Sequence, residues 1–143
     1  MLVFVNAMIP LPGETAGAWW ENTGAVEARV AEAKRRGYGA KFDIATYFLH
    51  DVPAEALRGG EAHQREEAQI VFTERCEFPG WPPIPTHVVA ARDDRFFPLQ
   101  FQKRVARTGL KKDVHVIPGG HLVNCGSSSV GASACKALRT HSL

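Results

Sequence analysis

The chain has 143 residues, of which 45% are hydrophobic and 22% charged, a size and composition typical of one soluble globular domain. Its formal net charge is only +2, so charge singles out neither nucleic acid nor an acidic membrane surface as a partner. The three cysteines show no CxxC spacing and are too few for a disulfide scaffold, which favours a reducing, cytoplasmic location. The apolar opening MLVFVNAMIPL lacks the basic leader of a signal peptide and is far shorter than the about 20 residues that span a bilayer. We therefore expect a cytoplasmic protein without nucleic-acid or membrane partners.

A buried strand is predicted at residues 2–5, because LVFV is a continuous run of β-favouring residues that is interrupted soon afterwards by Asn6 and Pro10. Runs of this kind are typical of strands covered on both faces in parallel α/β sheets. Such a strand needs neighbours, and domain boundaries usually fall in polar linkers. We therefore expect that a segment of the same sheet precedes Met1, and that residues 1–10 contribute one strand to that sheet.

Residues 11–83 are punctuated by glycines and predict a mostly helical insertion. Val26, Val30 and Ala33 recur at helical spacing in a charged stretch. Asn22 or Thr23 is expected to cap this helix, and Gly37 to end it.

Two further helices are expected in the same insertion, one with Pro53 in its first turn and one from Glu61 to about Arg75. The stretch PGWPPIP, residues 79–85, cannot continue a helix and predicts a rigid extended connector back to the sheet.

The remaining elements alternate between strand and helix. THVVAA at residues 86–91 predicts a second buried strand, and DVHVI at residues 113–117 predicts a third. Between them, an amphipathic helix is expected at residues 98–108, with Gly109 as its stop. The order strand, helical insertion, strand, helix, strand predicts an α/β fold with a parallel sheet.

Candidate catalytic residues follow two of these strands. Asp93 and Asp94 come directly after the second strand, and His121 closes the PGGH loop after the third. Because ligands bind at the carboxyl ends of parallel strands, topology places these residues at one edge of the sheet. A carboxylate beside an imidazole fixes the tautomer of the ring and stabilises its protonated form, as a general base for a serine nucleophile requires.

Four stretches of the chain resemble the α/β-hydrolase family, in particular small esterase-like members similar to plant methylesterases and hydroxynitrile lyases. They are LVFVNAMIPLPGE at residues 2–14, YFLHDVP at 47–53, PTHVVAARDDRFFP at 85–98 and PGGHL at 118–122. The resemblance implies the C-terminal part of a hydrolase domain over residues 1–123. Residues 11–83 would then form a helical cap, and residues 84–123 would supply the acid strand, a helix and the histidine loop.

The resemblance implies that Asp94 is the acid and His121 the base of a Ser-His-Asp triad. The family's acid usually lies three residues after a glycine, and this register matches Asp94 if Ala91 takes the glycine's place. The alternative is that Asp93 and Asp94 only cap the following helix, whose positive end attracts carboxylates.

The nucleophile of that triad is not encoded in these residues. No serine has glycine both two positions before and two positions after it, so the GxSxG turn is absent. Ser127, Ser128 and Ser129 follow the histidine, which is the wrong chain order. The Ser-, Gly- and Ala-rich tail at residues 124–143 is also atypical of the closing helix of the family.

Four aromatic or imidazole side chains are candidates for contacting substrate. Trp19 and Trp20 follow a Gly-rich stretch, and Tyr47 and His50 lie in the predicted cap. The alternative for Trp19 and Trp20 is packing against the sheet, and the alternative for Tyr47 and His50 is a place in the core of the cap. The six histidines show neither HExxH nor Cys-His spacing, so no metal and no cofactor is expected.

Two classes of function remain. The first is an ester or acyl hydrolase acting on a small molecule, in which Asp94 orients His121 and a serine outside this chain is the nucleophile. The second is a non-catalytic protein, either a degenerate fragment or a half-domain that needs a complementary chain or self-associates through an exposed sheet edge.

Overall fold

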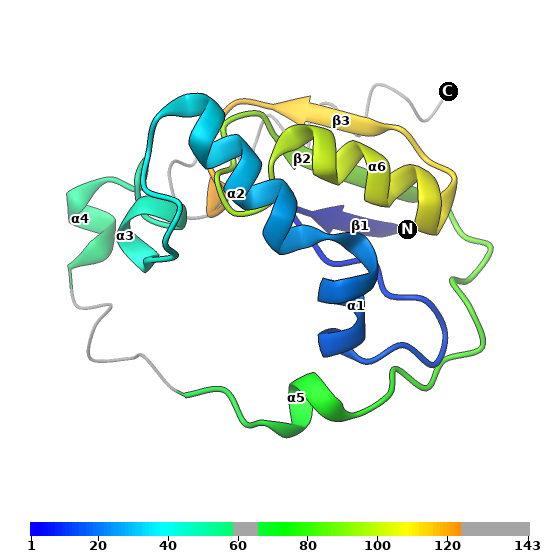
Figure 1. The fold of residues 1–143 in the computed structure, drawn as a ribbon. Coiled ribbons are helices and arrows are strands. Elements are labelled where there is room, and N and C mark those ends of the chain that lie inside the picture. The colour runs from blue at the N-terminus through cyan, green and yellow to red at the C-terminus, as the bar shows by residue number, and fades with distance from the viewer. Residues whose placement is uncertain (59–65, 124–143) are drawn as a thin grey trace.

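A three-stranded parallel sheet organises the computed structural model, which describes residues 1–58 and 66–123 (Figure 1). The strands are β1 (Leu2–Val5), β2 (Thr86–Ala91) and β3 (Val114–Ile117), in the spatial order β1-β2-β3. β1 pairs with β2 from Leu2 opposite Thr86, and β2 pairs with β3 from Val88 opposite Val114. With six helices in the described residues, the predicted α/β class with a parallel sheet is confirmed.

Burial is greatest in the central strand. The last four residues of β2 are all buried, whereas Phe4 is the one buried residue of β1. Successive side chains of a strand point to opposite faces of the sheet. Phe4 and Val88 accordingly pack with the helix side, and Val89 packs with Ile117 on the other side. We expected the first strand to be covered on both faces. In the structure β2 has this burial, whereas β1 is an edge of the described sheet and three of its four residues are only partly buried.

Helix α6 (Leu99–Leu110) follows β2 and precedes β3 in the chain. It packs against one face of the sheet (Figure 1). Its buried residues are Phe101, Gln102, Val105 and Ala106, a stripe with helical spacing. The prediction that Gly109 ends this helix is wrong. Gly109 is helical, and Lys111 ends the helix with a positive φ of 56°. Gly109 instead allows close packing, since a Cβ there would lie 2.8 Å from Cγ2 of Ile9.

The predicted insertion contains helices α1 (Ala16–Thr23) and α2 (Ala25–Arg36), which lie near α6 in Figure 1. Thr15 caps α1 by accepting from the N–H of Ala18 at 3.0 Å. The prediction that Asn22 or Thr23 caps α2 is wrong, because Gly24 occupies that position with a left-handed backbone and no side-chain bond. Gly37 ends α2 as expected.

Where the rest of the insertion is described, it holds three single-turn helices, namely α3 (Ile44–Tyr47), α4 (Ala54–Leu57) and α5 (Ile70–Thr73). Pro53 is the N-cap of α4, adjacent to its predicted place in the first turn. The predicted helix from Glu61 to Arg75 is reduced to α5 where the chain is described, and its segment 61–65 lies outside the described residues. The predicted tail at 124–143, with Ser127, Ser128 and Ser129, also lies outside them.

Candidate functional site

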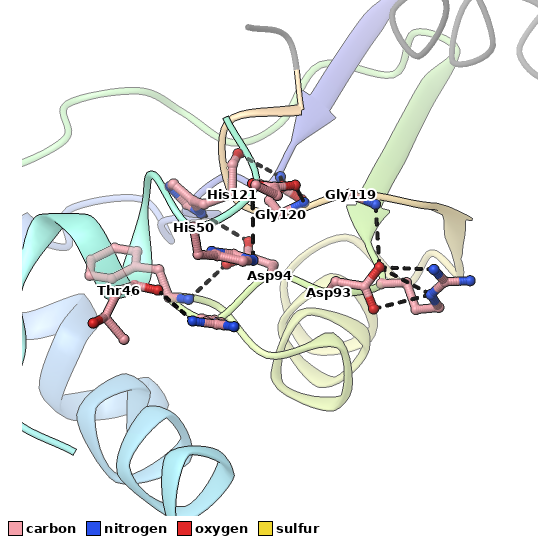
Figure 2. A network of polar contacts seen from close by, with 12 residues as sticks. Thr46, His50, Asp93, Asp94, Gly119, Gly120 and His121 are labelled. Atoms are coloured by element: carbon pink, nitrogen blue, oxygen red, sulfur yellow. Dashed lines mark hydrogen bonds and ion pairs between the residues drawn. The ribbon is translucent and has the colours of Figure 1, made fainter. Parts of the chain in front are cut away.

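Asp94 and His121 form a hydrogen-bonded pair where β2 and β3 end (Figure 2). Nδ1 of His121 lies 2.9 Å from Oδ2 of Asp94. The carboxylate is fully buried, whereas the imidazole keeps 13% of its side-chain surface exposed. The acid is thus sealed from solvent while the ring retains an accessible part. The protonated Nδ1 of His121 donates its hydrogen to the carboxylate. Nε2 is then the ring nitrogen that can exchange a proton with a ligand.

The Asp94 carboxylate is held by the start of α6 as well as by the histidine. Oδ1 accepts from the backbone N–H groups of Phe96 at 2.8 Å and Phe97 at 2.9 Å. Oδ2 accepts a second bond from Nε2 of Gln102 at 3.3 Å. An ionised carboxylate offers about four acceptor positions, and here four donors are directed at it. Asp94 therefore caps the turn before α6 with one oxygen and orients the histidine with the other.

Asp93 faces away from the histidine ring. It forms an ion pair with Arg92 at 2.9 Å, and its backbone N–H donates to the carbonyl of Gly119 at 3.0 Å. Hydrogen bonding from Arg92 lowers the pKa of the Asp93 carboxyl. Of the two adjacent aspartates, only Asp94 is in contact with His121.

Three phenylalanine rings surround the His121 imidazole. Phe48, Phe96 and Phe97 meet it edge to face, with ring centroids 4.6, 5.0 and 5.5 Å away. Phe96 and Phe97 belong to the loop that carries Asp94, whereas Phe48 comes from the turn after α3. The ring is therefore fixed in an apolar environment, where its hydrogen bond to Asp94 is stronger than in water.

The main chain of the histidine loop is held by polar side chains from distant segments. Asn6 at the end of β1 donates from Nδ2 to the carbonyls of His121 at 2.8 Å and Gly120 at 3.3 Å. The Asp51 carboxylate, from the segment after α3, accepts the N–H of Gly120. Sequence reasoning assigned no role to Asn6, Gln102 or Asp51. The position of Asn6 directly after a predicted strand was the one available signal.

His50 lies against the same loop (Figure 2). Its side chain is 11% exposed, and its Nδ1 atom is buried without a hydrogen-bond partner among the described residues. Burial lowers the pKa of the His50 imidazole, and the positive charge of Arg95 lowers it further. The neutral ring is therefore favoured at this position.

The other residues predicted to contact substrate occupy different depths. Trp19 is 1% exposed and donates from Nε1 to the carbonyl of Ile9, and Tyr47 is 0% exposed and donates from its hydroxyl to Gly39. Trp20 is partly buried and packs on Phe96 and Phe97. Trp20 and His50 thus lie close to the residues that surround His121, whereas Trp19 and Tyr47 are buried in the core. A role in ligand binding stays a prediction for all four residues.

Within residues 1–58 and 66–123, no group of three or more His, Cys, Asp or Glu side chains is placed to hold a metal ion. His87 and His115 approach each other with ring nitrogens 3.5 Å apart, but they are only two. In the same part of the chain, no helix is long and apolar enough to cross a membrane.

The described residues define an α/β protein in which a hydrogen-bonded aspartate and histidine occupy the carboxyl edge of a parallel sheet. Comparisons of the chain with family models, with curated proteins and with solved structures find no match.

Proposed function

We propose that Asp94 and His121 are the acid and base of a serine-hydrolase-type site of α/β-hydrolase architecture, acting on a carboxylic ester or related acyl compound. The observation that carries this proposal is the 2.9 Å contact between Nδ1 of His121 and the sealed Asp94 carboxylate at the carboxyl edge of the sheet. The chain order, with the acid after β2 and the histidine after β3, supports the same assignment because the family follows this order.

In this proposal His121 is the general base. Its Nε2 accepts the proton of a serine hydroxyl as that oxygen attacks the acyl carbon, and then returns the proton to the departing alcohol. Asp94 keeps the proton on Nδ1 and stabilises the imidazolium that forms in between. The four donors around the carboxylate support this role, since they hold it in one orientation.

The serine must come from outside these 143 residues, because no GxSxG segment occurs in them. One edge of β1 is free of strand pairing within the described sheet, so it can accept a further parallel strand. A serine at the carboxyl end of such a strand would lie on the same edge as His121.

Two measurements test the proposal. The 143-residue chain by itself should not be labelled by a serine-directed fluorophosphonate, and stoichiometric labelling of any of its serines would contradict this expectation. In a protein extended by a segment with a GxSxG turn, turnover should fall by about 10⁴ for His121→Ala or Asp94→Asn.

Asp93→Asn is the matched control, because Asp93 is paired with Arg92 and does not touch the ring. It should leave most of the turnover intact. Equal losses of turnover in Asp94→Asn and Asp93→Asn would show that the acid is assigned wrongly. An extended protein without any ester hydrolysis would favour a structural role for Asp94 and His121.

A further inference from the structure

We propose that Asp51 is a positioning residue that couples the cap-like segment after α3 to the base His121, an inference that rests on the proposed hydrolase function. Asp51 does not touch the His121 ring. It acts on the main chain one residue earlier, where its carboxylate accepts the N–H of Gly120. The two residues are 69 positions apart, so this bond joins two separate parts of the chain.

The absence of a side chain at Gly120 makes room for this contact. A Cβ atom at residue 120 would lie 2.6 Å from Cε1 of His50 and closer still to Oδ1 of Asp51. Real Cβ atoms do not approach neighbours so closely, so any other residue would push His50 and Asp51 away from the loop. The absence of a side chain at Gly120 and the carboxylate of Asp51 therefore serve the same close approach.

Other tethers of the histidine loop come from the sheet edge itself. The side-chain amide of Asn6 donates hydrogen bonds to the carbonyls of Gly120 and His121, and the backbone N–H of Asp93 donates one to the carbonyl of Gly119. Asp51 differs because it belongs to the segment that also carries Phe48, whose ring meets the His121 imidazole at 4.6 Å. One short segment thus holds both the ring and the peptide of the base loop.

The same segment is itself anchored close to the acid. Nη1 of Arg95, the residue after Asp94, donates to the carbonyl of Thr46 at 3.3 Å. A displacement of residues 46–51 would therefore alter the bond to Gly120 and the packing on His121 together. Because His50 is a candidate for substrate contact within this segment, a ligand bound against it would bias the position of the base.

The test uses the 143-residue chain without substrate. NMR would follow two signals: hydrogen exchange of the Gly120 amide, and the downfield Nδ1 proton of His121 that reports its bond to Asp94. In Asp51→Ala the Gly120 amide should exchange about tenfold faster or more, the ratio that corresponds to its lost hydrogen bond to Asp51. The Nδ1 proton should also broaden through faster exchange with water. Asp51→Asn keeps an acceptor oxygen and should show smaller changes of the same kind.

Glu55→Ala is the matched control. Glu55 is an exposed carboxylate in α4, four positions after Asp51, and its side chain makes no hydrogen bond to the histidine loop among the described residues. It should leave both signals unchanged. Unchanged signals in Asp51→Ala and Asp51→Asn, or equal changes in Glu55→Ala, would overturn the coupling. An absence of ester hydrolysis in any form of the protein would count against the proposed function alone, because these signals need no turnover.

Discussion

The side-chain amide of Asn6 donates to the backbone carbonyl of His121 at 2.8 Å, across 115 residues of sequence. Its Oδ1 atom accepts the N–H of Ala91, the last residue of β2, at 2.8 Å. Asn6 lies directly after β1 and thus links the end of β2 to the loop after β3, and its backbone has a positive φ of 46°. Asparagine is one of the few residues that adopt such a backbone readily.

Replacing Asn6 should destabilise the fold through both its side chain and its backbone. Asn6→Ala should lower the free energy of unfolding by about 3 kcal/mol, since each buried polar group left without a partner costs about 1–3 kcal/mol. Asn6→Gly should be less harmful by about 1 kcal/mol, because glycine tolerates the positive φ. Asn6→Asp should be the worst, because it turns a carboxylate oxygen toward two carbonyls. Urea unfolding would measure the order, and an Asp variant as stable as wild type would contradict it.

Gln102 should contribute more to stability than its neighbour Gln100 on the same helix. Gln102 is buried and donates to Oδ2 of Asp94 and to the carbonyl of Phe97, whereas Gln100 is exposed. Gln102→Ala should cost about 1–3 kcal/mol of unfolding free energy. Gln100→Ala should stay within about 0.5 kcal/mol of wild type. Chemical denaturation of both variants measures the difference, and equal stabilities would show that the Gln102 contacts contribute nothing.

Gly109→Ala should destabilise the protein even though Gly109 is inside a helix. Helix propensity alone predicts a gain of about 1 kcal/mol. The added methyl group would lie 2.8 Å from Cγ2 of Ile9, which is buried, and overpacking of this kind costs about 1–3 kcal/mol. In an Ile9→Ala background the same substitution should become neutral or stabilising. Thermal melts of the four proteins in this cycle provide the test, and a stabilising effect in the wild-type background would refute the packing argument.

Protonation of His50 should lower the free energy of unfolding as the pH falls. Its folded-state pKa is lowered from 6.5, chiefly by burial, so the unfolded chain takes up the proton more readily. The stabilising contribution is therefore complete above the unfolded pKa and is lost as the pH falls from there toward the folded pKa. His50→Gln should flatten this part of the profile when unfolding free energy is measured from pH 8 to pH 5. An identical profile in the variant would show that His50 does not contribute.

Local patterns in the sequence predicted the elements of the sheet. The apolar runs at residues 2–5 and 86–91 are strands, and the amphipathic repeat after Pro98 is helix α6. These predictions succeed because strand and helix periodicity report which side chains must be buried. The two aspartates Asp93 and Asp94, and His121, were also found as candidates, because they lie in the loops that follow predicted strands.

The sequence by itself therefore determined the order of strands and helices and the presence of an acid and a histidine after β2 and β3. The tertiary structure decided that Asp94 rather than Asp93 touches the ring, that Gly109 continues its helix beside Ile9, and that Asp51 holds the histidine loop. The last of these contacts joins residues 69 positions apart, and the hydrogen bonds of Asn6 to the same loop span more than 100. Periodicity and capping preferences act over a few residues, so they carry no information about which distant groups the packed sheet brings together.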